Sequence, residues 1–416
     1  MAWRTPGAPL YLPAPPHPAR ATLVSTSALP RSAPDVLVVG AGVIGASVAW
    51  HLAARGVTSV VLLDAGAAPG AGSTGRATGG YRGQFSTAVN VRLSLASREK
   101  LRRFEAEVGT DPQYREVGYL FLCDGPAHLA AFREARAVQH ACGLHEATEL
   151  SVSEAAALAP HARMDGVAGA AWCPTDGTIR PMEILRGYLG GVERAGVPVQ
   201  WGARVTAVAR GAGGRIVAVD STAGRFTPGQ VVNAAGAWAG GVAALAGVGL
   251  PVHPARRQIA VALGHGLPDD VPMTIWARDA FHLRVRDGQA LLNWPVDTPA
   301  EEPFSLALHR PWVEATWAMA RERVPAMARA RLDDTAHWAG LYELSPDKTV
   351  ILGYDPACPN LLLVNGSSGH GVMHSPALGH LAAELLLDGR ATLLDVHPLR
   401  PTRFAEGDAH PVNDLL

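Results

Sequence analysis

The sequence has few cysteines, no excess of charge of one sign and no long hydrophobic run. Its four cysteines (Cys123, Cys142, Cys173 and Cys358) are far apart, which excludes a disulfide scaffold and indicates ordinary thiols in a cytoplasmic protein. The formal net charge is −1, so charge predicts neither nucleic acid nor an anionic membrane as a partner. Glycine or charge interrupts every apolar run well before the roughly 20 residues that a membrane-spanning helix needs. No membrane span is predicted.

What the chain does have is length and apolar content. It contains 416 residues, of which 48% are hydrophobic, and this predicts a large core and more than one domain. Residues 1–34 are rich in proline, alanine and serine and contain no acid, so we predict a disordered tail. A targeting segment or an overlong start also fits this composition, although the prolines oppose an amphipathic targeting helix.

A strand, a glycine-rich turn and a helix follow the tail. Residues 35–39 form a short β-branched run, residues 40–45 contain three glycines, and residues 46–54 read as a helix. A second apolar run, 59–63, ends at Asp64 about 20 residues after the glycines, where an acid on a parallel strand meets a ribose hydroxyl. This order predicts a βαβ unit that binds a dinucleotide.

The three glycines each have a mechanical role in such a unit. Gly40 permits the tight turn, Gly42 lets the backbone approach a pyrophosphate, and Gly45 lets the helix pack closely on the strand. The N-terminus of the helix then faces the phosphates.

The same pattern recurs near the C-terminus. Residues 361–364 read as a strand, residues 365–374 are rich in glycine, and a helix follows that stops at Gly389. Between the two patterns, small residues at 233–238 allow another close backbone approach to a ligand. Further predicted strands are 118–123, 199–204, 205–210, 216–221 and 230–233, and further predicted helices are 126–142, 151–158 and 311–327.

Four blocks of sequence together resemble the D-amino-acid oxidase superfamily of flavoenzymes. They are 40–45, 72–82, 233–238 and 368–373, and they resemble most closely the branch with sarcosine oxidase and dehydrogenase, glycine oxidase and the β subunit of proline dehydrogenase. The resemblance implies an α/β fold in which a Rossmann-like FAD-binding domain is interleaved with a smaller α+β substrate domain built on an antiparallel sheet. The implied FAD-binding domain comprises 35–110, 176–246 and 337–393, the substrate domain comprises 111–175 and 247–336, and residues 394–416 form a C-terminal tail.

The resemblance also implies which residues hold FAD. Asp64 replaces the glutamate usual in the family at the ribose. Some relatives attach the flavin through a cysteine or a histidine, but Gly340 and Arg76 stand at those positions, so we expect non-covalent FAD. The implied cofactor-binding residues are Gly40, Gly42, Val43, Ile44, Gly45, Asp64, Ser73, Thr74, Val205, Ala235, Gly236, Trp238, Gly369, His370, Gly371 and Met373.

An amino-acid substrate needs a cation for its carboxylate, and arginine offers a planar bidentate partner. Arg82 aligns with a family arginine that faces the carboxylate and is our first candidate, the alternative being a structural arginine paired with a carboxylate or carbonyl. Arg284 is the second candidate, and its alternative is an exposed strand arginine. Met373 replaces a lysine of monomeric sarcosine oxidases, which argues against sarcosine itself.

Two further residues are candidates at the catalytic centre. His370 either assists removal of the amine proton or, as its glycine neighbours favour, has a packing and cofactor role. Tyr342 either hydrogen-bonds the substrate or packs against the flavin.

We therefore predict an FAD-dependent enzyme that oxidises the C–N bond of a small amino acid or N-alkyl amino acid, such as sarcosine, glycine or proline, by hydride transfer to flavin. The electron acceptor is oxygen, or a protein or quinone. The alternatives are a flavoprotein subunit of a multi-subunit amino-acid dehydrogenase, which implies a hetero-oligomer, and a non-catalytic FAD-binding assembly factor.

Overall fold

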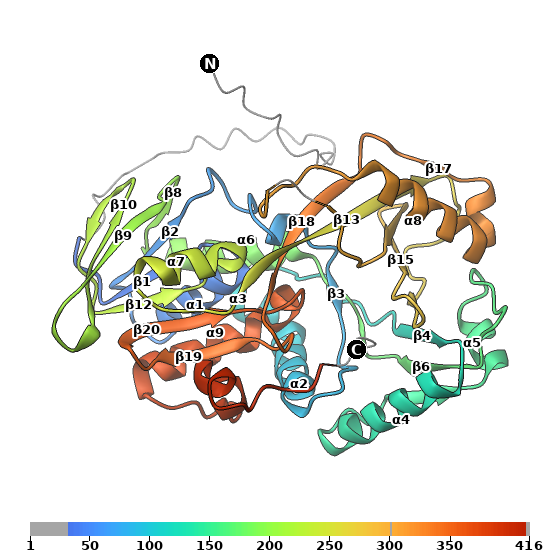
Figure 1. Cartoon of the computed structure of the whole chain (residues 1–416), viewed down its shortest axis with the longest axis horizontal. Helices are drawn as coiled ribbons and strands as arrows, with labels where there is room; N and C mark the ends of the chain where they lie inside the picture. The colour runs from blue at the N-terminus through green and yellow to red at the C-terminus, as the bar shows by residue number, and fades with distance from the viewer. Residues whose placement is uncertain (1–31, 300–301, 413–416) are drawn as a thin grey trace.

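The computed structural model describes residues 32–299 and 302–412. Two large sheets dominate it, and the long strands β13 (His253–Leu263) and β18 (Trp338–Leu344) run between the two halves of the molecule (Figure 1). The helices are α1 (Val43–Ala54), α2 (Ala88–Arg102), α3 (Phe104–Val108), α4 (Pro126–Ala141), α5 (Val152–Leu158), α6 (Pro181–Arg194), α7 (Ala239–Leu245), α8 (Arg310–Arg323) and α9 (Gly371–Asp388).

The first sheet has six strands in the order β19-β20-β12-β1-β2-β8. All neighbours are parallel except the edge strand β19, which is antiparallel to β20. Parallel neighbours need crossover connections, and helices supply them. The strands are β1 (Val36–Val39), β2 (Val60–Asp64), β8 (Val199–Trp201), β12 (Gln230–Asn233), β19 (Ile351–Asp355) and β20 (Cys358–Asn365).

Small residues let α1 and α9 approach the sheet and each other closely. A Cβ atom added to Gly45 would lie 1.8 Å from the carbonyl oxygen of Gly40, and one added to Gly379 would lie 2.1 Å from Oγ of Ser47. Ser47 Oγ instead donates a hydrogen bond to the Ser375 carbonyl at 2.8 Å. These contacts fix both helix N-termini near the carboxyl ends of β1 and β20, where α/β sheets bind ligands.

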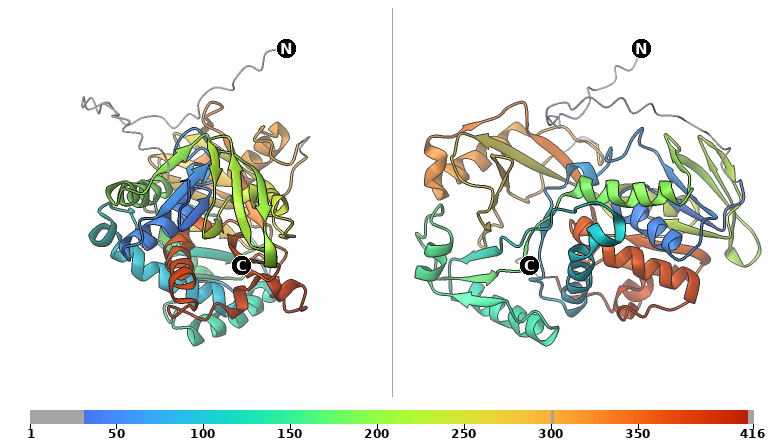
Figure 2. Two further views of the ribbon diagram at one scale, coloured as in Figure 1. Left: turned by 90° about the vertical axis from the view of Figure 1, so that its left-hand side faces the viewer. Right: turned by 180° about the vertical axis from the view of Figure 1, so that it is seen from behind.

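The second sheet has nine strands in the order β17-β13-β16-β15-β14-β4-β6-β5, with β18 also paired to β13. Its strands come from residues 119–173 and 253–344, and most neighbours are antiparallel, the β14–β4 pair being parallel. Figure 2 shows this sheet from behind, beside the first. The other strands are β4 (Tyr119–Cys123), β5 (Thr148–Leu150), β6 (Gly169–Cys173), β14 (Met273–Trp276), β15 (His282–Arg286), β16 (Gln289–Asn293) and β17 (Arg331–Leu332).

The two faces of this sheet differ in character. Ala260 is paired with Leu292 and Leu292 with Leu283, so these three share one face, where Trp312 of α8 belongs to the same apolar cluster. Alternate residues face the other way. That opposite face carries polar side chains, including those of Arg257, His282, Arg284, Asn293 and Tyr342.

Smaller sheets complete the fold. β9 (Val205–Arg210), β10 (Ile216–Ser221) and β11 (Gly224–Phe226) form an antiparallel sheet, and β3 (Gly80–Tyr81) pairs with β7 (Gly177–Thr178). None of the helices in residues 32–299 and 302–412 is long and apolar enough to cross a membrane.

Most predicted elements are confirmed with small shifts at their ends. The predicted helix 151–158 begins with a capping box, in which Oγ of Ser151 accepts a hydrogen bond from the backbone N–H of Glu154 and the Glu154 carboxylate accepts one from the N–H of Ser151. The predicted helix 311–327 is instead α8 followed by a 3₁₀ turn, Pro325–Ala328, because Val324 is extended and precedes a proline. The predicted strand 199–204 ends early, at Trp201.

The domain boundaries stay a prediction, but two observations bear on them. β18 falls within the segment assigned to the FAD-binding domain, yet its partner is β13 of the second sheet. Residues 394–412 of the predicted C-terminal tail contain two 3₁₀ turns, and Arg403 within them is fully buried. Of the predicted N-terminal tail, residues 1–31 lie outside the described residues.

Candidate functional site

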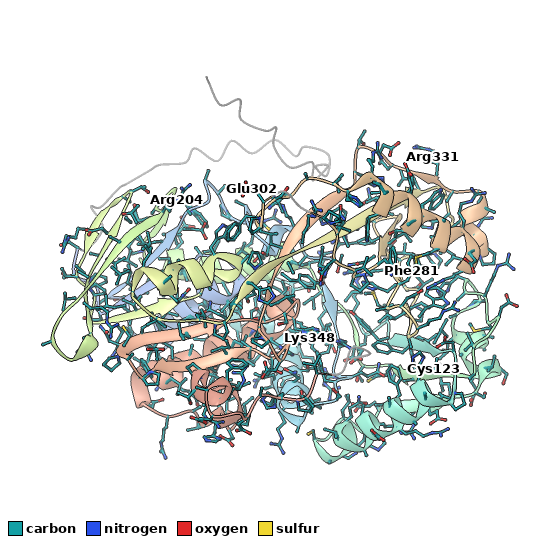
Figure 3. All side chains as sticks on the ribbon, in the orientation of Figure 1. Cys123, Arg204, Phe281, Glu302, Arg331 and Lys348 are labelled. Carbon is teal, nitrogen blue, oxygen red and sulfur yellow. The ribbon has the colours of Figure 1, made fainter. Side chains whose placement is uncertain are left out.

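A cavity of about 730 Å³ runs along the carboxyl ends of the first sheet and under the polar face of the second. Its size lies within the usual range for ligand clefts. In Figure 3, Arg204, which lines the cavity, and Cys123 of β4, which does not line it, lie on opposite sides of the molecule. Of the predicted cofactor-binding residues, those that line the cavity are Gly40, Gly42, Val43, Ile44, Asp64, Ser73, Thr74, Val205, Ala235, Gly236, Trp238, Gly369, Gly371 and Met373, whereas Gly45 and His370 do not.

The glycine turn before α1 shapes one end of the cavity. Gly40 has φ +103°, and a Cβ atom there would lie 2.3 Å from the Ala234 carbonyl oxygen. The space beside Gly42 is open, because the only atom that its Cβ would approach is Oγ1 of Thr74, at 3.5 Å. That hydroxyl accepts a hydrogen bond from the N–H of Val43 at 3.1 Å. The positive end of α1 therefore faces an open space suited to an anion.

Asp64 organises the loops at this end as well as lining the cavity. One oxygen of its carboxylate accepts a hydrogen bond from the N–H of Ala41 at 2.8 Å, and the other accepts one from the N–H of Gly66 at 2.7 Å. Each carboxylate oxygen has a second lone pair, so acceptor capacity remains for a ribose hydroxyl.

The other end of the cavity lies at the turn before α9. Gly369 has φ +94°, and a Cβ atom there would lie 2.5 Å from the ring of Tyr342, so the tyrosine packs directly on the glycine backbone. Tyr342, Gly371 and Met373 line the cavity, which places the first turn of α9 against it. A second helix N-terminus thus faces the same space.

Three buried polar side chains near this turn have atoms without a hydrogen-bond partner among the described residues. They are Oε2 of Glu343, Oγ of Ser367 and both polar atoms of the Asn365 amide. Glu343 and Ser367 line the cavity. Because unpaired buried polar groups cost free energy, this cluster suits a ligand rich in hydroxyl and carbonyl groups. Burial raises the pKa of Glu343, whose Oε1 accepts a hydrogen bond from the N–H of Ser367 at 3.2 Å.

Arg82 lies next to this end of the cavity without lining it. Its Nη2 atom lies 3.2 Å from Nε2 of His370, and its Nη1 atom donates to the Gln84 carbonyl at 3.2 Å. Its guanidinium lies over the ring of Phe85, 4.3 Å from the centroid. Burial lowers the pKa of Arg82, and no acidic side chain of the described chain forms an ion pair with it.

The charge of the Asp176 carboxylate acts on the pKa of Arg82, but its oxygen atoms form hydrogen bonds with other groups. It is fully buried and accepts hydrogen bonds from the N–H of Gly83 at 2.5 Å and from Nε2 of Gln84 at 3.0 Å. Burial raises the pKa of Asp176 to about 6. Asp176 therefore fixes the segment after β3 that carries Arg82.

The surroundings of His370 disfavour the protonated form of its ring. Burial, and then the charge of Arg82, lower its pKa well below the ordinary value. Nε2 accepts from the Arg82 guanidinium, since a guanidinium has no acceptor. The alternative in which His370 titrates near neutrality is not supported, and the packing and cofactor role is favoured.

Arg284 is not the exposed strand arginine of the alternative reading, because its relative exposure is 4%. Its Nη1 atom donates to the carbonyl of Thr78, and its Nε atom has no partner among the described residues. It supports the cavity wall at Thr78 and does not line the cavity.

Sequence reasoning missed several polar residues of the wall, among them Arg257, Asn293 and Glu343. Glu343 directly follows Tyr342 in the sequence, so an acid next to a candidate site residue was a usable signal. Arg257 and Asn293 carry no motif. Only the strand register shows that they share a face with Tyr342.

The sequence profile of the DAO family, described as FAD dependent oxidoreductase, matches residues 35–385. The chain belongs to this family. FAD is accordingly its cofactor, and the mixed α/β fold is the one predicted.

Proteins that are similar to this chain in sequence or in structure are consistent with its membership of this family. FAD-dependent oxidoreductase domain-containing protein 1 of Xenopus laevis is 30% identical, over 91% of this chain and 84% of that protein. Glycine oxidase of Geobacillus kaustophilus is 26% identical, over 89% of this chain and 97% of its own. The structure of L-proline dehydrogenase from P. horikoshii superposes with a TM-score of 0.83 at 25% identity, covering 91% of this chain and all of that one.

The residues present fit FAD. The space at Gly42, the two helix N-termini and the unpaired atoms of Glu343 and Ser367 match a pyrophosphate and a polar ring system. Among the described residues that line the cavity there is neither a cysteine nor a histidine. This supports the prediction that FAD is held without a covalent bond.

Proposed function

We propose that this protein oxidises the C–N bond of a small amino acid or N-alkyl amino acid by hydride transfer to FAD. The observation that carries the proposal is Arg82, a partly buried cation beside the flavin end of the cavity with no acidic partner in the described chain. A buried charge without a counter-charge is costly, and a substrate carboxylate supplies that charge.

The surroundings of Arg82 suit amine oxidation. The rings of Phe85 and Phe121 have centroids 4.3 and 5.8 Å from Cζ of Arg82, and the ring of His370 lies beside its guanidinium, so these side chains shield it partly from solvent. In such surroundings the attraction between a carboxylate and Arg82 is stronger than in solvent. FAD, when bound, accepts the hydride. The protein holds the carboxylate and orients the C–H bond, and orientation supplies much of the rate.

Met373 narrows the range of substrates. It lines the cavity and is 3% exposed, so the first turn of α9 presents a thioether and no cation there. An apolar side chain accommodates carbon better than a second charge. We therefore propose a substrate larger than sarcosine.

The first experiment records the visible spectrum of the FAD-loaded protein under anaerobic conditions while small amino acids with one carboxylate, including proline, glycine and sarcosine, and with two carboxylates, including aspartate and glutamate, are added singly. Bleaching by one of them supports the proposal and identifies the substrate class. Readmission of air then separates an oxidase, whose colour returns rapidly, from a dehydrogenase that needs another acceptor. A protein that holds FAD yet is bleached by none of the amines contradicts the proposal and favours the non-catalytic alternative.

Replacement of Arg82 tests the carboxylate site. We expect Arg82→Gln to lower the second-order rate constant of flavin reduction about tenfold or more, since a charged hydrogen bond is worth roughly 1.5–3 kcal/mol. Arg82→Lys should retain part of the rate, because the charge remains without the bidentate geometry. The control is Arg278→Gln, at an arginine whose side chain is 62% exposed. An unchanged rate in Arg82→Gln assigns Arg82 a structural role.

A further inference from the structure

The polar face of the nine-stranded sheet presents a second cation to the cavity. Arg257 of β13 lines it, and its guanidinium lies over the ring of Tyr342, 5.6 Å from the centroid. Ala255 is paired with Tyr342, so Arg257 is a diagonal neighbour of the tyrosine on the same face. Tyr342 also packs on Gly369, next to His370, whose Nε2 atom lies 3.2 Å from Nη2 of Arg82, so both cations lie near one cavity wall.

The present partner of Arg257 is weakly held. Nη1 of Arg257 lies 2.8 Å from Oδ1 of Asp297, but the Asp297 side chain is 86% exposed while that of Arg257 is 14% exposed. Asp297 is in the chain after β16, outside any helix or strand. Because a solvated carboxylate contributes little to such a pair, another anion can displace Asp297 from Arg257.

Asn293 supplies a second polar group on the same wall. It is 4% exposed and lines the cavity, and its Oδ1 atom has no hydrogen-bond partner among the described residues. Leu292 before it is paired with Ala260, so Asn293 and Ile259 project to the cavity face together. Because Oδ1 is an acceptor, a ligand N–H or O–H group would complete it.

We propose that Arg257 forms a second anion-binding subsite beside Asn293, whose Oδ1 atom accepts a hydrogen bond from an N–H of the substrate, and that the substrate is an amine that carries two carboxylates, one bound at Arg82 and the other at Arg257. The proposal rests on amine oxidation as the function of this cavity. It explains why Arg257 lies over the ring of Tyr342 in the cavity wall, and why its counter-charge, Asp297, lies in solvent.

The test uses unreactive carboxylates, so it does not depend on turnover. Titration of the FAD-loaded protein with succinate, glutarate, acetate or propionate is followed by the difference spectrum of the flavin. We expect each dicarboxylate to bind about tenfold or more tightly than the monocarboxylates, since one charged hydrogen-bonded contact is worth that factor. Arg257→Gln should abolish this preference and leave monocarboxylate binding within about twofold.

Further variants separate a subsite from a structural contact. Asp297→Asn should strengthen dicarboxylate binding several-fold, because it removes the carboxylate that competes for Arg257. This substitution leaves every side chain that lines the cavity unchanged. Arg310→Gln is the matched control, at an arginine that is 60% exposed and ion-paired with Asp334. Equal binding of mono- and dicarboxylates by the unaltered protein, or an equal loss of both in Arg257→Gln, overturns the proposal.

The two proposals fail in different ways. If dicarboxylates bind with the expected dependence on Arg257 but no amine bleaches the flavin, the subsite stands and amine oxidation falls. If a monocarboxylic amine bleaches the flavin and Arg257→Gln has no effect on either kind of carboxylate, amine oxidation stands and the subsite falls.

Discussion

Glu343 is a buried acid of the cavity wall whose position there lowers the stability of the folded protein. The residue is 9% exposed, its Oε1 atom accepts a hydrogen bond from the N–H of Ser367, and its Oε2 atom is unpaired among the described residues. Burial raises its pKa, so the folded protein favours the protonated acid. Such a group lowers stability at any pH where the unfolded chain would ionise it.

A pH series on the FAD-free protein tests this interpretation of Glu343. Because the folded-state pKa is raised, the cost is absent below the ordinary carboxyl range and grows as pH rises. We therefore expect Glu343→Gln, which mimics the protonated acid, to match the unaltered protein at about pH 4 and to exceed its free energy of unfolding by about 1 kcal/mol or more near pH 8. Denaturant unfolding of the two proteins at each pH measures these free energies. Glu384→Gln is the control, because the pKa of Glu384 is lowered and the pH dependence should reverse.

At this scale the sequence predicted the residues whose chemistry follows a motif and missed those placed by long-range pairing. The glycines at 40, 42 and 369 were expected at a ligand, and each lines the cavity. The double use of Asp64 by the N–H groups of Ala41 and Gly66 was not expected, because it depends on how two loops meet. Arg257 was missed for the same reason.

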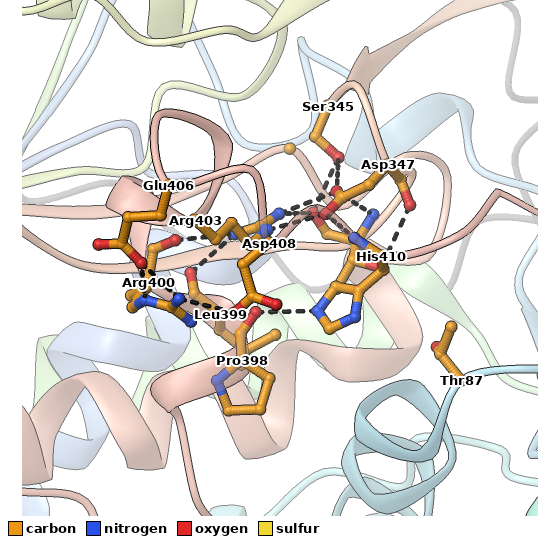
Figure 4. Close-up of polar contacts among 12 residues, drawn as sticks. Thr87, Ser345, Asp347, Pro398, Leu399, Arg400, Arg403, Glu406, Asp408 and His410 are labelled. Atoms are coloured by element: carbon orange, nitrogen blue, oxygen red, sulfur yellow. Dashed lines mark hydrogen bonds and ion pairs between the residues drawn. The ribbon is translucent and has the colours of Figure 1, made fainter.

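Among the elements, the turn from β18 to β19 shows how a remote segment supports the site. Asp347 in this turn forms an ion pair with Arg403 of the C-terminal 3₁₀ turn, with Nε–Oδ2 and Nη2–Oδ1 distances of 2.8 and 2.9 Å (Figure 4). Both side chains are fully buried, and Oγ of Ser345 donates to the Thr349 carbonyl at 2.8 Å. The contact ties residues 397–404 to the strand that carries Tyr342 and Glu343.

Removal of one partner should therefore leave a buried charge. We expect Arg403→Met to lower the free energy of unfolding by about 3–5 kcal/mol at neutral pH. Although burial opposes it, Arg403 holds the pKa of Asp347 below its usual range, so the contribution of the pair is present above that range and lost as pH falls through the folded-state value. The double variant Asp347→Asn/Arg403→Met should recover part of the loss. A single variant as stable as the unaltered protein contradicts the role of this pair.

The elements themselves were largely predictable, and their partners were not. The capping box at Ser151, the glycine stop at Gly389 and the strand at 205–210 follow local rules and are present. The pairing of β18 with β13 joins segments about 80 residues apart, and no local pattern encodes it. The C-terminal segment lacks apolar periodicity, yet it is ordered at Arg403 by one buried charge pair.

For the whole molecule, the cavity draws its wall from segments spread between residues 39 and 373 and from both large sheets. FAD that fills it contacts parts of the chain that are otherwise joined mainly by β13 and β18. Binding to the folded state alone raises stability by RT ln(1 + [L]/Kd), or about 2.7 kcal/mol at a free ligand concentration of 100 Kd. The melting temperature should therefore rise with FAD concentration.

Two glycine variants distinguish cofactor binding from folding. A methyl group at Gly42 would lie 3.5 Å from Oγ1 of Thr74 and would otherwise enter the cavity, whereas one at Gly40 would lie 2.3 Å from the Ala234 carbonyl oxygen at φ +103°. We expect Gly42→Ala to melt like the unaltered FAD-free protein but to lose the FAD-dependent rise. Gly40→Ala should lower stability by about 1–3 kcal/mol even without FAD, because its backbone conformation is strained. Thermal melts with and without FAD separate the two effects, and a Gly42→Ala protein that FAD stabilises as fully as the parent would show that the cofactor does not approach this turn.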